Sequence, residues 1–293
     1  MFQSALICTD FSDGLQRLAG FVSSLAAGGL QRLIFLHTIP ISNEREIPRV
    51  DESKIQAVRD RFQASFSNLP AGVTVEIDVQ YARVVDHILN ASKTHKPDVT
   101  LLGRSNRNQL DERVFGSTLL ELCRRITNPV LMLRPQLISA YTDEELDLRC
   151  RHLFRYLMIP YDGSDSANYL VSQIKQGAQR QSDKSLECVF LCWVVDNSGR
   201  RELRATAEQQ QATEKLAAVK ADLETTGLQV ATEIRLGEPI IELLASAVER
   251  DITAIAAASG TMGTLLSWSI PSLTNEILHR SWHPVLFFPP ARS

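Results

Sequence analysis

The stretch "RLIFLHTI" at residues 32–39 contains a continuous apolar run, Leu33 to Leu36, which is followed by a histidine, a threonine and an isoleucine. A run without polar alternation predicts a strand covered on both faces, as in a parallel sheet. A similar run, "CVFLCWVV", returns at residues 188–195, with Phe35-Leu36 matching Phe190-Leu191. A buried strand that recurs at a domain-sized interval indicates two copies of one α/β unit.

Three further blocks repeat in the same order. "ALICTDFSDG" matches "LMIPYDGSDS", which places Asp10 opposite Asp162. Ala82 falls opposite Gly237, and "TNPVLMLRP" matches "WHPVLFFPP" near the end of each copy. We therefore predict two similar domains, at residues 1–139 and 153–293, joined by a charged linker at residues 140–152.

Strands and helices alternate within each copy. The third strand alternates apolar and polar residues, which is typical of a sheet edge, and Ser12 or Asp13 is expected to cap the first helix. The β-α-β-α order predicts an α/β fold of two tandem doubly wound domains, each a five-stranded, mainly parallel sheet flanked by helices. In the first copy we expect strands at 4–9, 32–39, 73–81, 98–103 and 129–133, and helices at 13–27, 51–67, 84–95 and 117–126.

The composition is that of a soluble globular protein, with 44% hydrophobic and 22% charged residues among 293. A formal net charge of −3 gives no general reason to expect nucleic acid or an acidic membrane as a partner. The sequence predicts neither a signal peptide nor a membrane-spanning helix. The five cysteines are scattered and lack metal-site spacing, so we expect no metal site and a cytoplasmic protein.

Two loops of the first copy are expected at the carboxyl ends of the strands, where such sheets bind ligands. The first carries Thr9-Asp10-Phe11-Ser12, and an acid there can accept hydrogen bonds from ribose hydroxyls. The second lies within "LLGRSNRNQLDERVFGST" at residues 101–118 and ends at a helix N-terminus, which suits phosphate. Its candidate ligand groups are backbone at glycine or asparagine, two hydroxyls and an arginine: Gly103, Arg104, Asn106, Gly116, Ser117 and Thr118.

These features also have simpler interpretations. Gly-Ser-Thr before a helix is an ordinary cap, loop arginines are usually solvated, and Asp10 could cap the first helix. We interpret His37 as a satisfied, partly buried residue, and Trp193 and Trp268 as packing residues or part of the domain contact. The Walker loop, the G-x-S-x-G elbow and the H-E-x-x-H motif are all missing from the sequence, so no catalytic residue is predicted.

On "ICTDFSD", "FLHTI", the loop that starts at Gly103 and "NPVLML", the chain resembles the universal stress protein family, and specifically its tandem members. The resemblance covers nearly the whole chain. Nucleotide-binding members carry G-x-x-G, nine residues and then G-[ST]. The first copy keeps this spacing with Asn106 in place of one glycine, and Cys8 stands where binders often have proline.

The resemblance implies a Rossmann-like, adenine nucleotide alpha hydrolase-like fold that holds ATP or another adenine nucleotide, with or without Mg²⁺. Asp10 would lie near the ribose, backbone around Thr38 near the adenine, and Cys8 and Thr9 beside them. Residues of the second loop would hold the phosphates. In the second copy Ala258, Thr261 and Pro271 replace Gly103, Asn106 and Gly116, and proline offers no N–H. We therefore expect nucleotide in the first domain alone.

The expected function is that of a cytoplasmic stress-response regulator in which the second domain is a structural partner. The last strands of the two copies could pair to form an intramolecular pseudo-dimer, which could itself form a homodimer. One alternative is an interaction or chaperone-like module that binds no nucleotide. Another is a slow ATP hydrolase, although the sequence offers no evident general base and no lysine for the γ-phosphate.

Overall fold

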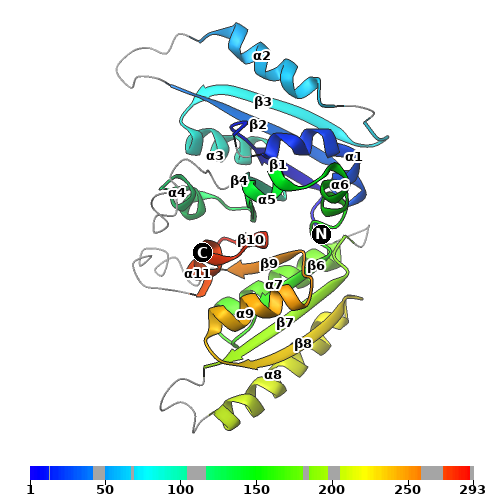
Figure 1. Cartoon of the computed structure of the whole chain (residues 1–293), viewed down its shortest axis with the longest axis vertical. Helices are drawn as coiled ribbons and strands as arrows, with labels where there is room; N and C mark the ends of the chain where they lie inside the picture. The colour runs from blue at the N-terminus through cyan, green and yellow to red at the C-terminus, as the bar shows by residue number, and fades with distance from the viewer. Residues whose placement is uncertain are drawn as a thin grey trace. The chain divides into compact units, whose positions relative to one another are not determined.

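The computed structural model describes residues 1–12, 14–41, 50–66, 69–103, 117–180, 185–196, 205–258 and 273–290. Contacts divide the chain into two compact units, one of residues 2–151 and one of residues 152–293 together with Met1. Each unit contains a sheet flanked by helices (Figure 1).

Strands and helices alternate in the first unit as the sequence predicts. In its nine-residue third strand all positions but one are half-buried or exposed, whereas the first strand is almost wholly buried. The elements are β1 (Ser4–Cys8), η1 (Leu15–Phe21), α1 (Val22–Ala27), β2 (Arg32–Pro40), α2 (Glu52–Gln63), β3 (Thr74–Ala82), α3 (Val84–His95), β4 (Val99–Gly103), α4 (Ser117–Arg125), β5 (Val130–Leu133), α5 (Pro135–Ala140) and α6 (Asp143–Arg151).

The strands of the first unit lie in the order β3-β2-β1-β4-β5 and are paired in parallel. The prediction of a doubly wound sheet with the third strand at its edge is confirmed. Because such crossovers are right-handed, α1 and α2 cover one face, and α3 and α4 cover the other. The core lies around β1, where Ala5, Leu6 and Ile7 are fully buried.

The first helix differs from the prediction. It starts as a 3₁₀ helix, η1, and becomes α-helical only at Val22. The expected cap by Ser12 is wrong, because the Ser12 hydroxyl donates to the Asp10 carboxylate at 2.6 Å. Gly14, at a left-handed φ of 77°, precedes η1 without a side-chain cap. Asp13, the other expected cap, lies outside the described residues.

The segment expected as a linker contains α6, which packs on η1 and α1. The Arg17 guanidinium donates to the carbonyl oxygens of Ile138 and Tyr141 at 2.5 and 2.9 Å, and it pairs with Asp143 at 2.8 Å. Residues up to 151 therefore belong to the first compact unit.

The second unit repeats the topology, with strand order β10-β9-β6-β7-β8 and parallel pairing. Its second long helix, α8, is eight residues longer than α2. The elements are β6 (Tyr156–Pro160), α7 (Asp165–Arg180), β7 (Cys188–Val195), α8 (Ala205–Glu224), β8 (Gln229–Leu236), α9 (Pro239–Glu249), β9 (Ala254–Ala258), α11 (Leu273–Arg280) and β10 (Val285–Phe288).

Strand registers correct one detail of the expected repeat. Cys8 of β1 pairs with Leu36 of β2, and its counterpart Pro160 of β6 pairs with Cys192 of β7. The counterpart of Leu36 is therefore Cys192, one residue later than the sequence match with Leu191 suggested. In consequence Trp193 corresponds to His37, and Val194 corresponds to Thr38.

Candidate functional site

The carboxyl end of β1 is the point at which the first sheet changes its winding direction. The chain passes from β1 to β2 on one side, whereas β4 lies on the other side. Cys8 pairs with Leu36 and with Leu102, which places these three residues side by side on neighbouring strands. Thr9, Thr38 and Gly103 follow them within one or two residues and therefore lie at the same edge of the sheet. Ligands of doubly wound sheets bind at this topological switch point.

A tight turn follows β1 and is held by its own side chains. The backbone N–H of Phe11 donates to the Thr9 hydroxyl oxygen at 3.0 Å, and the N–H of Ser12 donates to the Asp10 carboxylate at 2.8 Å. The backbone N–H of Thr9 donates to the Leu36 carbonyl oxygen at 3.1 Å, which anchors the turn to β2. Thr9 is buried while Asp10 is exposed, so a carboxylate is presented at the end of the sheet.

Phe11 anchors this turn to α2. Its φ is 62°, a left-handed conformation that costs a non-glycine residue roughly 1–2 kcal/mol. The ring lies 4.7 Å from the His37 ring and 4.9 Å from the Phe62 ring, measured between centroids. The Arg61 guanidinium carbon lies 4.0 Å from the Phe11 centroid. These contacts offset the backbone strain and set the direction of the turn.

His37 is a satisfied residue, as the sequence interpretation proposed. Its Nδ1 lies 2.9 Å from the Thr9 carbonyl oxygen, which requires Nδ1–H to be the donor. Burial lowers the pKa of His37, while the hydrogen bond to Thr9 and the charge of Asp10 act in the opposite direction. His37 is therefore mainly neutral near pH 7 and fixes the carbonyl that precedes Asp10.

On the opposite face of β2, Thr38 joins a buried polar network that the sequence interpretation missed. The Thr38 hydroxyl lies 2.8 Å from Nδ1 of His87, whose Nε2 lies 3.1 Å from the Asp78 carboxylate. The His87 side chain is fully buried. His95 continues the network, 3.5 Å from Asp78 and 3.3 Å from Glu76.

The sequence did contain a signal for this network. Glu76 and Asp78 alternate with Val75, Ile77 and Val79, so both acids lie on one face of β3. Burial alone would raise the pKa of Asp78, but hydrogen bonds from His87 and Gln80 outweigh burial, and the pKa lies below the ordinary value. The carboxylate is therefore ionised at neutral pH.

The expected phosphate loop is only partly described. Gly103 is half-buried at the end of β4, and α4 begins at Ser117 as predicted. Arg104, Asn106 and Gly116 lie outside the described residues, as do the side chains of Ser117 and Thr118. Their phosphate contacts stay a prediction.

The second domain carries large rings at the corresponding strand ends. Tyr161, the counterpart of Thr9, is buried and lies edge-on to Trp193 with ring centroids 5.7 Å apart. Ala258 corresponds to Gly103 and is buried. Asp162 keeps the position of Asp10, is exposed, and accepts the Ser164 backbone N–H at 2.9 Å. The acid is thus retained, while its surroundings are not.

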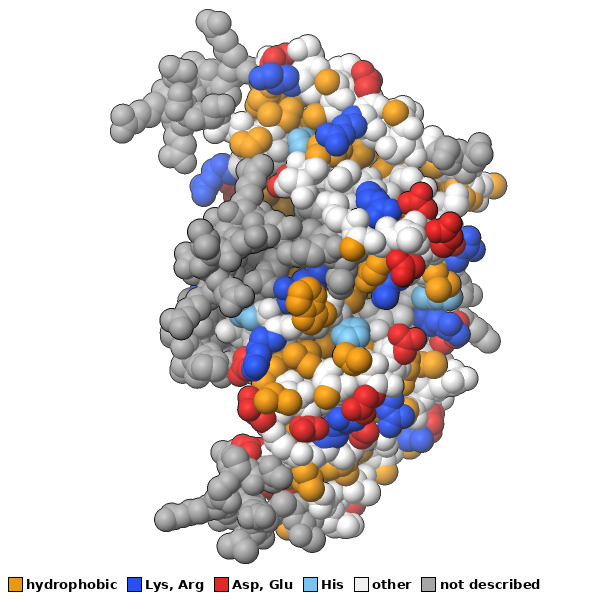
Figure 2. Space-filling model, in the orientation of Figure 1, with side chains coloured by type: hydrophobic (Ala, Val, Ile, Leu, Met, Phe, Trp, Pro, Cys, Tyr) orange, Lys and Arg blue, Asp and Glu red, His pale blue; other side chains and the backbone are white. Residues whose placement is uncertain are grey.

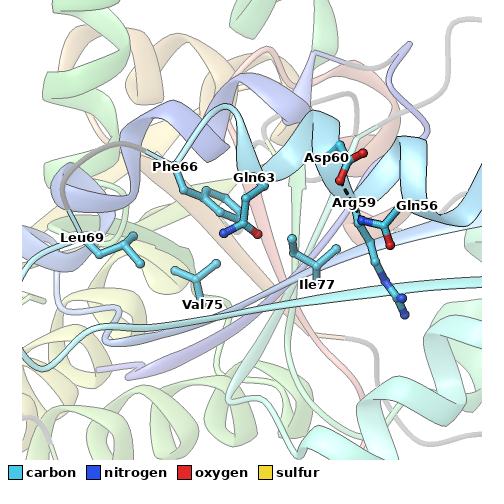
Figure 3. A pocket seen from close by; sticks show the side chains of 8 residues that line it. All are labelled: Gln56, Arg59, Asp60, Gln63, Phe66, Leu69, Val75 and Ile77. Atoms are coloured by element: carbon cyan, nitrogen blue, oxygen red, sulfur yellow. Dashed lines mark hydrogen bonds between the residues drawn. The ribbon is translucent and has the colours of Figure 1, made fainter.

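A groove of about 400 Å³ lies elsewhere, between α2 and the edge strand β3 (Figure 3). Val75 and Ile77 form its floor, with Phe66 and Gln63 opposite. None of its lining residues is a predicted ligand contact. The groove lies along the first half of the edge strand and away from the carboxyl ends of the strands, so it is separate from the candidate nucleotide site.

The described surface has a mixed electrostatic character. On the face shown in Figure 2, acidic and basic side chains are interspersed, in keeping with 34 acidic and 31 basic residues in the sequence. The described residues contain no cluster of three or more histidine, cysteine or acidic side chains arranged for a metal ion. Across the same residues, no helix combines the length and apolar character needed to span a membrane.

Comparison with known proteins identifies the architecture. The model of the universal stress protein family matches residues 1–134 and again residues 154–289. A universal stress protein from Archaeoglobus fulgidus DSM 4304 is 18% identical, with a TM-score of 0.66, over 98% of this chain and 99% of that one.

A protein of unknown function from Pseudomonas aeruginosa PAO1 is 15% identical, with a TM-score of 0.60, over 99% of this chain and 93% of that one. No curated protein matches significantly. At these identities the solved structures show the shared fold, whereas the family model matches the sequence itself in both halves. The chain therefore belongs to the universal stress protein family, as a tandem member with two family domains in one polypeptide.

Proposed function

We propose that this protein is a cytoplasmic stress-response regulator that binds ATP or a related adenine nucleotide in its N-terminal domain. The nucleotide would lie at the carboxyl ends of β1, β2 and β4. Asp10 would accept hydrogen bonds from the ribose hydroxyls, and backbone around Thr38 would face the adenine. Gly103 and the loop to α4 would surround the phosphates, and Mg²⁺ would be bound to the phosphates.

The observation that supports this proposal best is the turn after β1. Its hydrogen bonds fix a conformation in which Thr9 is buried and Asp10 is exposed at the switch point of the sheet. A carboxylate in that place accepts hydrogen bonds without a charge partner being needed, which suits the paired hydroxyls of a ribose. Gly103, at the end of the neighbouring strand, allows a close approach of backbone to ligand.

The second domain is proposed as a structural partner without nucleotide. The rings of Tyr161 and Trp193 replace the smaller side chains of Thr9 and His37, and buried Ala258 replaces Gly103. Pro271, which corresponds to Gly116 in the sequence, would remove an N–H from the expected phosphate loop. The proposal therefore predicts one nucleotide for each chain.

The test is calorimetric titration of the full chain with ATP, ADP and AMP in the presence of Mg²⁺. Asp10→Ala and Asp162→Ala form a matched pair, because both carboxylates are exposed and accept the backbone N–H two residues later. We expect Asp10→Ala to weaken binding about tenfold or more, as the loss of charged hydrogen bonds would. Asp162→Ala should bind as wild type does.

Two results would contradict the proposal. Equal losses in the two variants would mean that binding is not confined to the first-domain site. No binding of any adenine nucleotide to the wild type would remove nucleotide from the function and favour the interaction module. Gly116→Pro, which reproduces the second-copy residue, provides an independent check of the phosphate loop and should abolish binding.

A further inference from the structure

Helix α9 of the second domain leaves an apolar stripe exposed. Ile241 is 50% exposed and Val248 is 70% exposed, and between them lie half-buried Leu244 and exposed Ala245. Residues three, four and seven apart share one side of an α-helix, so these four side chains form one continuous surface, which we call the α9 stripe. Helix α9 lies on the visible face of the second domain in Figure 1, and hydrophobic side chains gather over it in Figure 2.

The first domain shows that the fold does not require apolar residues at these positions. Helix α3 corresponds to α9, since α3 begins at Val84 and α9 begins at Pro239, its counterpart in the repeat. The exposed positions of the α9 stripe are taken in α3 by exposed polar residues, with Asp86 for Ile241, Asn90 for Ala245 and Lys93 for Val248. Exposed apolar side chains gathered on one surface are typical of a contact with another molecule.

At the first end of the α9 stripe lies an exposed cation. Arg280, the last residue of α11, approaches Glu238 at 4.0 Å and Glu276 at 3.1 Å. Its side chain is nevertheless 51% exposed, and a guanidinium has five N–H donors. These two partners therefore leave donors available for a further acid.

At the second end of the α9 stripe lies an exposed acid. Asp251 follows α9 at a left-handed φ of 50°, beside the negative end of the helix dipole. The neighbouring Arg250 is directed elsewhere, because its guanidinium lies 5.1 Å from the Phe190 ring centroid and 3.4 Å from the Glu233 carboxylate. A cation from another molecule would therefore be favourable beside Asp251.

We propose that the α9 stripe is a surface through which two molecules of this protein associate. A two-fold axis at the middle of α9 pairs the helix with its equivalent in antiparallel orientation. Ile241 of one molecule then packs beside Val248 of the other, and Arg280 of one molecule faces Asp251 of the other. Antiparallel pairing also sets opposite ends of the two helix dipoles side by side. This inference goes beyond nucleotide binding and does not depend on it.

The charges around the α9 stripe favour a second molecule of this protein over a membrane surface. Helix α9 contains Glu242 and Glu249 and no lysine or arginine. Helices that bind at anionic membrane surfaces instead carry lysine and arginine on their polar face. A second molecule supplies both an apolar stripe of equal length and an arginine for the acid at the far end.

The stripe is small, which sets the expected strength of association. From Ile241 to Val248 the helix rises only about 10 Å. Interfaces well below the standard size of about 1,600 Å² belong to weak or transient complexes. We therefore expect a dissociation constant in the micromolar range.

The first experiment is sedimentation velocity of the full chain between about 2 and about 200 µM, which covers that range. Ile241→Asp and Val248→Lys each introduce the residue that the first domain has at that position. Each should raise the dissociation constant about tenfold or more, because dimerisation would then bury a charge among apolar groups. Leu148→Asp is the control, since Leu148 is an exposed apolar residue of α6, outside the stripe, and it should associate as wild type does.

The second experiment exchanges the charges at the two ends. Asp251→Lys is tolerated by the backbone, because the first domain has Lys96 in the same left-handed conformation, at a φ of 47°. Asp251→Lys and Arg280→Glu each place like charges at both ends of the dimer, so each variant alone should associate about tenfold more weakly. Mixed in equal amounts, the two variants should form a heterodimer about as strong as the wild-type dimer, since both ends then join opposite charges.

Recovery in the mixture also shows that both variants are folded. A wild-type chain that stays monomeric through the whole concentration range would overturn the inference. Association that Ile241→Asp and Val248→Lys leave unchanged, or that Leu148→Asp weakens equally, would overturn it as well. Charge variants that do not associate more strongly in the mixture than alone would contradict the antiparallel pairing.

Discussion

A substitution at Gly28 tests whether α6 packs on α1 as part of the first domain. It follows α1, and a Cβ atom there would lie 2.7 Å from the Cys150 carbonyl oxygen and 2.9 Å from that of Arg151. Its φ of −82° is open to any residue, so alanine brings no backbone strain and only this contact. Both oxygens belong to the backbone at the end of α6, and they move only if the helix moves.

The expected loss of stability follows from two opposing effects. Overpacking a close contact costs about 1–3 kcal/mol. Replacing glycine by alanine also restricts the unfolded chain, which stabilises the folded state by about 0.4–1 kcal/mol. For Gly28→Ala we expect a net loss of about 1–2 kcal/mol, equivalent to roughly 2–4 °C in Tm for each kcal/mol in a domain of this size. Gly20→Ala is the control, because its Cβ would meet nothing within 4 Å.

The assay is urea unfolding of the full chain, followed by circular dichroism and by tryptophan fluorescence. All three tryptophans, Trp193, Trp268 and Trp282, lie in the second half of the sequence, whereas circular dichroism reports on both domains. Gly28→Ala should lower the urea midpoint of the unfolding step that circular dichroism detects and tryptophan fluorescence does not. Equal stability of Gly28→Ala and Gly20→Ala would refute the packing of α6 on α1 and restore residues 140–152 as a linker.

Three other measurements test the first domain and the thiols. Phe62 is 1% exposed and contacts Phe11 and Phe35, so Phe62→Ala should destabilise the first domain by about 3–5 kcal/mol in the same unfolding assay. The folded-state pKa of Asp78 is depressed, so its carboxylate stabilises the fold above the unfolded pKa, and this contribution is lost as the pH falls through the lower folded value. Asp78→Asn should therefore be less stable than wild type near pH 7, with the difference shrinking below about pH 4 in acid titrations. Burial raises the pKa of Cys123, Cys150 and Cys192 to about 12, and it also raises the pKa of Cys188. Cys188 is half-buried whereas the other four cysteines are buried, so Cys188 should react first with a thiol reagent, and Cys188→Ser should remove the fast phase.

The strands and the duplication could be predicted because each is recorded in a local pattern. The run at 32–39 is continuous and apolar because β2 is covered on both faces, and the alternation at 73–81 reflects an edge position. Asp10 could be placed at the end of β1 for the same reason. The hydrogen-bond partners of side chains at that end could not be predicted from the local sequence pattern, since Ser12 donates to Asp10 and does not cap the helix.

The role of α6 had a much weaker signal. Its sequence "DEELDLRCR" buries only Leu146 and Cys150, so the apolar positions are too few to indicate packing. Its position depends on polar contacts with Arg17 and Ser24, more than 120 residues earlier in the chain. The charges of this segment suit a solvated linker when only the sequence is considered, because the guanidinium and the hydroxyl that donate to Asp143 and Asp147 belong to distant elements.

By itself, then, the sequence determined the succession of strands and helices along the chain, the family and the presence of two copies. Apolar periodicity shows which face of each element is buried. Only the tertiary structure decided which polar groups meet. Thr38, His87 and Asp78 come from three elements, and their contact requires β3 beside β2 with α3 across both. The one-residue register that makes Trp193 the counterpart of His37 was equally hidden, because hydrogen-bond pairing between strands, and not local pattern, sets it.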